Sequence, residues 1–319
     1  MIDITFENPM YLWYLLSIPL LIYTHFYLFK HSKKTAMKFA NFAALRRVTG
    51  KHLITKNIIV LIIRVVILIS LIIAASGGEL WYEGKVNQND FVIAIDTSAS
   101  MAAQDISPTR LEAAKEAAIE FVGSLGSRSN IGIISFSGTT FVETIPIDNM
   151  NSIKKTIENI DVAKTGGTDI AGAIITGTNL LLPYEKGKTI VLITDGSNTV
   201  GAFITDSVAS SIAYAVSKHV IVHSIGVGSD AGPIGYLPEY YNISAVFHGD
   251  TLEEISNQTG GFYFQANNKG ELIQAYRQIS EASDIGFIPL NLSYGLILIA
   301  LLLLFVEWGL LSTRFRKIP

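Results

Sequence analysis

The sequence contains no cysteine among its 319 residues, and only 16% of them are charged. Without cysteine the chain can form no disulfide framework, no thiolate metal site and no cysteine nucleophile. Soluble domains carry roughly 25% charged residues, so this chain is short of charge, as expected if part of it is not exposed to water. Apolar residues make up 49% and aromatic residues 10% of the chain, which excludes disorder throughout.

Three long apolar runs account for the missing charge. They cover residues 10–29, 58–76 and 287–311, and each is close to the roughly 20 residues that a helix needs to cross a bilayer. The first run does not resemble a secretory signal peptide, because Asp3 and Glu7 precede it and no lysine or arginine does. We therefore expect three transmembrane helices.

The basic residues predict the orientation of these helices. Residues 30–56 contain eight lysines and arginines and no acidic residue, and residues 312–319 contain three more basic residues. Basic segments beside membrane helices favour the cytoplasm, so the region between the second and third helices is expected on the extracytoplasmic side of the cell membrane. The expected organisation is an N-terminal segment with the first helix (1–29), a basic loop (30–56), a second helix (57–76), a linker (77–89), a folded domain (90–283), a third helix (287–311) and a basic tail (312–319).

The folded domain is acidic. Residues 85–285 carry 22 acidic and 12 basic side chains, a net charge of −10. Nucleic-acid binding needs a basic face, so we expect no nucleic acid as a partner of this domain. The basic loop 30–56 is explained more simply by contact with the anionic headgroups of the lipid membrane.

Strands and helices alternate along the folded domain. Short β-branched runs at 91–95, 131–136, 189–194 and 220–227 lack polar alternation, which is typical of strands buried on both faces. Amphipathic stretches separate them, and this order predicts an α/β fold with a doubly wound, mostly parallel open sheet. Residues 139–147 follow the second strand after only two residues, which favours an antiparallel edge strand. Helices are expected over 110–125, 150–160, 169–182, 206–218, 251–257 and 269–283, with a last strand over 261–266.

Oxygen-bearing side chains follow the strands of the predicted sheet. Ligands of open α/β sheets bind beyond the carboxyl ends of the strands, so residues just after each strand are the first candidates for a site. Asp96, Ser98 and Ser100 follow the first strand, Thr168 lies in a glycine-rich turn before a helix, and Asp195 follows the third strand. We expect these five side chains to converge at one edge.

The expected site is a metal site for magnesium. Two carboxylates and three hydroxyls are hard oxygen donors that suit Mg²⁺, with Mn²⁺ or Ca²⁺ as alternatives, whereas zinc and copper favour histidine and cysteine. We assign the hydroxyls to the metal and let the carboxylates bind directly or through water. An open position then leaves the ion electrophilic toward a carboxylate of a partner protein. Asp169 is either an acid at a helix N-terminus or a residue that binds the metal or supports one of its ligands.

The five side chains resemble the metal-ion-dependent adhesion site of von Willebrand factor type A domains, with Asp96-x-Ser98-x-Ser100 as the leading motif. The resemblance covers about residues 88–283. Residues 104–115 (QDISPTRLEAAK) and the flanking membrane helices also resemble the Bat-type aerotolerance membrane proteins. The resemblance implies a Mg²⁺-dependent protein-binding module that acts with MoxR-type AAA+ ATPases and other membrane proteins carrying such domains.

Two other functions remain open. One is a structural subunit of a MoxR-type ATPase-associated membrane complex, with the basic loop 30–56 and the helices as its interaction surface. The other is a Mg²⁺-dependent phosphohydrolase that uses Asp96, which would need an Asp-x-Asp arrangement or a general acid and a phosphate-binding lysine. Lys188 precedes its strand, at the opposite edge of the sheet. The sequence shows no nucleophile–base pair, so we expect a binding protein and not an enzyme.

The direction of the chain predicts where the site faces. The linker enters the first strand at its amino end, and the closing helix returns antiparallel to end near Asp284. Both connections therefore leave from the amino edge of the sheet. A site at the carboxyl edge should point away from the membrane.

Overall fold

The chain folds as two compact units in a computed structural model. One unit combines Met1–Tyr82 with Pro289–Pro319, and the other covers Glu83–Ile288. The basic loop 30–56 and the basic tail, apart from Ser312, lie outside the described residues. The described residues are 3–27, 58–85, 89–125, 129–184, 187–196, 204–228, 232–233, 244–245, 249–282 and 285–312.

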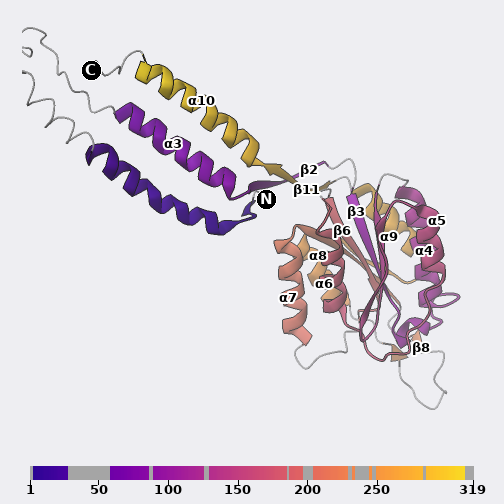
Figure 1. Cartoon of the computed structure of the whole chain (residues 1–319). Coiled ribbons are helices and arrows are strands. Elements are labelled where there is room, and N and C mark those ends of the chain that lie inside the picture. The colour runs from indigo at the N-terminus through magenta and orange to yellow at the C-terminus, as the bar shows by residue number, and fades with distance from the viewer. Residues whose placement is uncertain are drawn as a thin grey trace, which may run out of the picture. The chain divides into compact units, whose positions relative to one another are not determined.

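The unit Glu83–Ile288 is built on a mostly parallel sheet (Figure 1). The chain starts in the middle of this sheet and adds strands outward on both sides, as predicted for a doubly wound fold. Only the last strand on one side is antiparallel to its neighbour, which confirms the predicted hairpin edge. In spatial order the strands are β10 (Tyr263–Ala266), β7 (Val220–Val227), β6 (Gly187–Thr194), β3 (Asn89–Asp96), β4 (Ile131–Phe136) and β5 (Thr140–Ile147).

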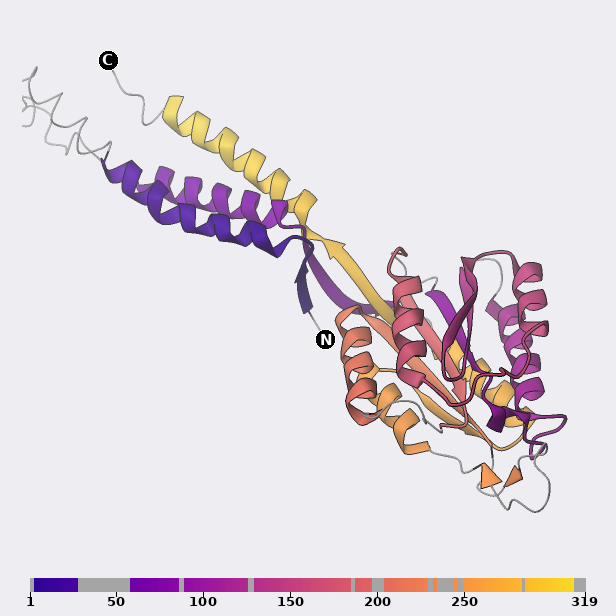
Figure 2. The ribbon, with the colours of Figure 1, turned by 60° about the horizontal axis from the view of Figure 1, so that its bottom comes forward.

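Helices cover both faces of this sheet (Figures 1 and 2). They lie close to the predicted ranges. A separate small sheet pairs β8 (Gly232–Pro233) with β9 (Ser244–Ala245). One face of the six-stranded sheet carries α4 (Arg110–Leu125), α5 (Met150–Glu158) and α9 (Lys269–Ala282). The other face carries α6 (Ile170–Leu181), α7 (Ile204–Ser217) and α8 (Gly249–Thr259).

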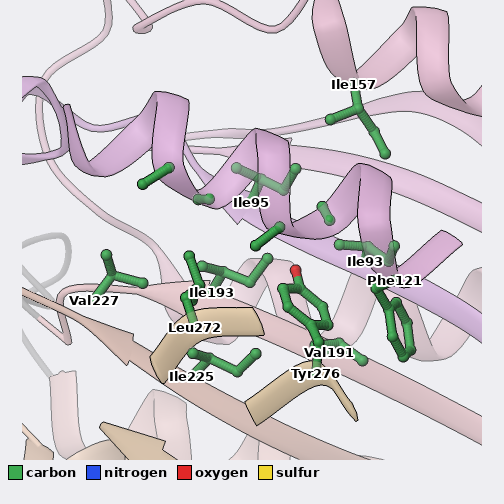
Figure 3. Packing of buried hydrophobic residues seen from close by; sticks show 14 of the residues in the cluster. Ile93, Ile95, Phe121, Ile157, Val191, Ile193, Ile225, Val227, Leu272 and Tyr276 are labelled. Carbon is green, nitrogen blue, oxygen red and sulfur yellow. The ribbon is translucent and has the colours of Figure 1, made fainter. Parts of the chain in front are cut away.

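The two faces have separate hydrophobic cores because side chains alternate along each strand. Ile93 and Ile95 of β3 point to one face, where they belong to the same core as Phe121 of α4 (Figure 3). Val92 and Ala94 point to the other face, into the core under α6, α7 and α8. A central strand that is apolar on both sides has no polar alternation, which explains the pattern of its sequence.

The chain enters and leaves this sheet at the same edge. β3 begins at Asn89, and α9, which returns along the sheet after β10, ends at Ala282. The carboxyl ends of the parallel strands lie at the opposite edge. The predicted site therefore lies at the edge opposite the one where the chain enters and leaves this sheet.

The other unit contains the apolar helices. Within the described residues, α3 (Ile58–Ala75) and α10 (Leu292–Ser312) are the helices long and apolar enough to cross a membrane. The first apolar run is divided into a 3₁₀ helix, η1 (Pro9–Leu16), and an α-helical stretch over 17–27. The residues that follow this stretch lie outside the described part of the chain. Among the described residues the structure thus gives two candidate membrane helices, where the sequence predicts three.

A sheet that the sequence did not indicate joins segments from distant parts of the chain. Its strands, in spatial order, are β1 (Asp3–Phe6), β2 (Gly78–Lys85) and β11 (Ile285–Asn291). The predicted linker 77–89 therefore contains a strand. Residues 287–291, predicted as the start of the third membrane helix, are also strand, and the helix begins at Leu292.

An ion pair joins α3 and α10 within their unit. Arg64 Nε lies 2.6 Å from Glu307 Oε1. Glu307 is buried, whereas the Arg64 side chain is 42% exposed. Each charge lies within an apolar helix, where an unpaired charge is energetically costly. Pairing lowers this cost for both side chains.

Candidate metal centre

The predicted carboxylates lie at the carboxyl edge of the central sheet. Asp96 is the last residue of β3 and pairs in register with Phe136, the last residue of β4. Asp195 follows Thr194, the last residue of β6, which pairs with β3 on its other side. Because parallel neighbours end at the same edge, the two carboxylates come together there.

Asp96 is fully buried, and its two carboxylate oxygens have different partners. Oδ1 accepts a hydrogen bond from the Ser98 backbone N–H at 2.7 Å, and Oδ2 accepts one from the Thr194 hydroxyl at 2.5 Å. The Thr194 oxygen accepts in turn from the Gly196 N–H at 3.1 Å. The carboxylate is thus fixed both by its own loop and by β6. The sequence did not single out Thr194, although a polar residue closing an apolar strand beside Asp195 was a usable signal.

The hydroxyls of Ser98 and Ser100 lie side by side, with their Oγ atoms 3.0 Å apart. Ser98 precedes η2 (Ala99–Ala102), a short 3₁₀ helix in the loop after β3. Adjacent ligands of an octahedral ion with bonds of ~2.0–2.1 Å lie about 3 Å from each other. The spacing of the two hydroxyls therefore suits neighbouring positions around Mg²⁺.

Thr168 is buried on a neighbouring loop, which contacts the first loop through backbone hydrogen bonds. The Ala163 N–H donates to the Thr97 carbonyl at 2.8 Å, and the Asp169 N–H donates to the Ser137 carbonyl at 2.7 Å. Thr97 and Ser137 directly follow β3 and β4. These contacts bring the loop of Thr168 to the same edge as the two serines.

Asp169 caps α6. It is the N-cap residue of that helix, and its Oδ1 accepts from the Gly172 N–H at 2.8 Å. A side-chain cap of this kind stabilises a helix by about 1 kcal/mol. Of the two interpretations left open by the sequence, the structure supports the acid at the helix N-terminus.

A buried arginine, which the sequence did not indicate, lies beside Asp195. Arg110 is the first residue of α4, and its side chain is fully buried. Its Nε and NH2 atoms donate to the two oxygens of Asp105 at 2.8 and 2.7 Å, and NH1 donates to Asp195 Oδ2 at 3.3 Å. An arginine at the start of an amphipathic helix usually faces solvent, so its position in the chain gave no signal.

The site concentrates negative charge in a buried place. Burial, and then the charge of Asp195, raise the pKa of Asp96. A divalent cation would relieve this repulsion. Among the described residues, no group of three or more histidine, cysteine, aspartate or glutamate side chains could hold a metal ion, so an ion here would also need the hydroxyls. Carboxylates and hydroxyls together form a donor set for a hard ion, and the residues therefore fit Mg²⁺.

Two known sequence families match parts of this chain. Residues 91–198 match the family described as von Willebrand factor type A domain, and residues 1–77 match the family described as aerotolerance regulator N-terminal. The central unit has the von Willebrand factor type A fold. Asp96, Thr168 and Asp195 all lie within the matched part of that domain.

Curated relatives extend the similarity over most of the chain. A UPF0353 protein of Nocardia farcinica is 28% identical over 296 residues, covering 85% of this chain and 86% of the relative. A UPF0353 protein of Mycolicibacterium gilvum is 26% identical over 298 residues, covering 88% and 86%. The similarity therefore extends well beyond the von Willebrand factor type A domain.

Solved structures share the fold of the von Willebrand factor type A domain. BatB from Bacteroides thetaiotaomicron and an aerotolerance-related membrane protein from Bacteroides fragilis are each 28% identical, cover 60% of this chain and 98% of their own, and have TM-scores of 0.52 and 0.53. A von Willebrand factor type A protein from Catenulispora acidiphila, 17% identical over 65% of this chain and 45% of its own, has a TM-score of 0.51. With the two apolar helices, these similarities indicate a Bat-like membrane protein whose domain belongs to a class that mediates protein interactions.

Proposed function

We propose that this membrane protein binds a partner protein through a Mg²⁺ ion held at the carboxyl edge of its von Willebrand factor type A domain. The observation that carries the proposal is the pair of hydroxyls of Ser98 and Ser100, 3.0 Å apart, next to the buried and doubly hydrogen-bonded Asp96. A purely structural turn after a strand needs neither this spacing nor a second buried carboxylate beside it.

Each side chain has a defined part in this proposal. The hydroxyls of Ser98, Ser100 and Thr168 hold the ion with neutral oxygens, while Asp96 and Asp195 supply the compensating charge directly or through water. The bound ion supplies a Lewis acid with a ligand position left for an incoming carboxylate. The partner is therefore expected to present an aspartate or glutamate side chain.

We further propose that three helices anchor the protein and that the domain lies on the extracytoplasmic side. The basic loop 30–56 supports a cytoplasmic position for the segment between the first two helices. Because the chain enters and leaves the sheet at the edge opposite the site, the site is expected to face away from the membrane.

Metal titration of the full-length protein in detergent tests the site. Mg²⁺ should bind to the wild type in calorimetry, and Mn²⁺ should give a bound signal in electron paramagnetic resonance that acetate, the simplest carboxylate, perturbs. Asp96→Asn and Thr168→Val should lose the ion while keeping the circular dichroism of the fold. Asp148→Asn, an exposed matched control, should bind like the wild type. A wild-type protein that ignores both ions overturns the proposal.

Cysteine labelling in intact cells tests the sidedness, since the chain has no native thiol. A maleimide that cannot cross the membrane should label Ser152→Cys, on the exposed face of α5, and should miss Ser32→Cys in the basic loop. The reverse labelling pattern would place the domain in the cytoplasm.

A further inference from the structure

We propose that Arg110 is the positioning residue of this site: its guanidinium orients Asp195 and competes with the metal ion for that carboxylate, and so sets the affinity of the site for Mg²⁺. This inference rests on the proposed function, and it concerns a residue outside the five expected oxygen donors.

The guanidinium is shared unequally between two carboxylates. It holds Asp105 in a two-pronged contact at 2.7 and 2.8 Å, a geometry that uses both carboxylate oxygens, and it reaches Asp195 by a single contact at 3.3 Å. All three side chains are almost completely inaccessible, with exposed fractions of 0% for Arg110, 6% for Asp105 and 0% for Asp195. Asp105 thus anchors the guanidinium, while the longer contact leaves Asp195 able to turn toward an ion.

The position of Arg110 is tied to the loop that carries the serines. The Arg110 backbone N–H donates to the Ala103 carbonyl at 3.0 Å, and the Ala103 N–H donates to the Ser100 carbonyl at 3.1 Å. The arginine therefore connects the loop after β3, which provides two hydroxyl donors, with the carboxylate after β6. A change at Arg110 therefore affects both the loop that carries the serines and the Asp195 carboxylate.

The end of β7 leaves room for the guanidinium. A Cβ atom built on Gly228 would lie 2.6 Å from Arg110 Cζ and 2.7 Å from its NH2, closer than real Cβ contacts. Gly228 also has a φ of +140°, a conformation that favours glycine. The planar cation therefore lies directly against main chain, and the glycine is a second position at which its placement can be altered.

Electrostatics gives the direction of the effect. A positive charge beside Asp195 offsets the repulsion between the buried carboxylates when no ion is bound, and it opposes the arrival of a divalent cation. Removing the guanidinium should make the ion-free protein less stable and the ion bind more tightly. A purely structural arginine would affect only the first of these two quantities.

Calorimetric Mg²⁺ titration and thermal unfolding of the full-length protein in detergent separate these roles. For Arg110→Met we expect a lower melting temperature without Mg²⁺, an affinity for Mg²⁺ raised by roughly tenfold, and a larger increase of the melting temperature on adding Mg²⁺ than in the wild type. Arg110→Lys keeps the charge, so its affinity should stay within about threefold of the wild type. Affinity that is unchanged or weakened in Arg110→Met overturns the inference.

Two further variants keep the test decisive if Arg110→Met does not fold. Arg110→Gln combined with Asp105→Asn removes one charge of each sign from the buried cluster, and it should still bind Mg²⁺ more tightly than Asp105→Asn alone. Gly228→Ala displaces the guanidinium without removing it and should shift the affinity in the same direction. A wild type that binds no Mg²⁺ refutes the proposed function itself, whereas normal wild-type binding with unshifted variants refutes only the role of Arg110.

Discussion

The Thr194 hydroxyl donates to Asp96 Oδ2 at 2.5 Å and so links the ends of two neighbouring strands. The two residues are 98 positions apart in the chain, yet the contact fixes the carboxylate at the centre of the proposed site. Substituting a residue that orients a metal ligand without touching the ion typically costs about 10- to 100-fold in metal affinity.

Thr194→Val should therefore weaken Mg²⁺ binding by about 10- to 100-fold while the protein stays folded. Valine has nearly the same shape as threonine, but it leaves Asp96 Oδ2 without its hydroxyl donor. Calorimetric titration measures the effect. Thr156→Val, which removes an exposed hydroxyl on α5, serves as the control and should bind like the wild type. Equal affinities in the two variants would contradict the proposed orientation of Asp96.

Asp169→Ala should lower the free energy of unfolding by about 1 kcal/mol, because α6 loses its N-cap. Asp169→Asn should retain most of the stability, since asparagine caps helices nearly as well as aspartate. Both variants should bind Mg²⁺ like the wild type in the same titration. Loss of the ion in Asp169→Asn would instead assign the carboxylate to the metal site.

His223 should make the domain less stable as the pH falls from about 6.5 toward 4. Burial lowers the pKa of this histidine to about 4, and its Nδ1 accepts the Phe262 N–H at 3.0 Å, which requires an unprotonated nitrogen. The unfolded chain takes up the proton first, so the stabilisation is complete above pH 6.5 and declines by up to about 3 kcal/mol at lower pH. Denaturant unfolding at several pH values measures this slope.

His223→Gln tests the assignment of that slope. The variant keeps a side-chain acceptor near the Phe262 N–H and has no group that titrates in this range. It should be less stable at neutral pH and should show a flatter dependence between pH 6.5 and 4. An unchanged slope would mean that other groups dominate the acid sensitivity.

Glu307→Gln should reduce the stability of the packing between α3 and α10 by about 1 kcal/mol, because Arg64 loses its charged partner within an apolar helix. The exchange Arg64→Glu with Glu307→Arg should recover part of the loss. Unfolding by SDS in mixed micelles measures both. If the single variant and the exchange both behave like the wild type, the pair contributes nothing to helix association.

Local sequence patterns were sufficient to predict the central fold. The ranges predicted for two strands, 131–136 and 220–227, are those of β4 and β7. These runs are rich in β-branched residues and are bounded by turn residues, so the local signal and the final structure agree. The short connection to residues 140–147 likewise predicted the antiparallel edge.

Only the site residues that directly follow a strand could be predicted from the sheet topology. The rule that ligands bind beyond strand ends was enough to select Asp96 and Asp195, and the structure places both at one edge. Metal binding by them stays a prediction. Arg110 could not be found in this way, because its partner Asp195 lies 85 residues away and only the folded chain brings them together.

The sheet of β1, β2 and β11 was missed for a similar reason. Residues 287–291 of β11 are apolar enough to join the membrane run that follows them, so hydropathy alone merges this part of the strand with the helix. A strand is recognised by its pairing partner, and here the partners come from distant parts of the chain.

The placement of the site at the far end of β3 from Asn89 has a mechanical consequence. Force applied between Asp96 and Asn89 would load the central strand along its own axis, between the parallel neighbours β6 and β4. In that shear geometry the hydrogen bonds on both sides of the strand share the load and must break together, instead of opening one after another. The central strand therefore resists an axial load better than an edge strand that peels away one hydrogen bond at a time.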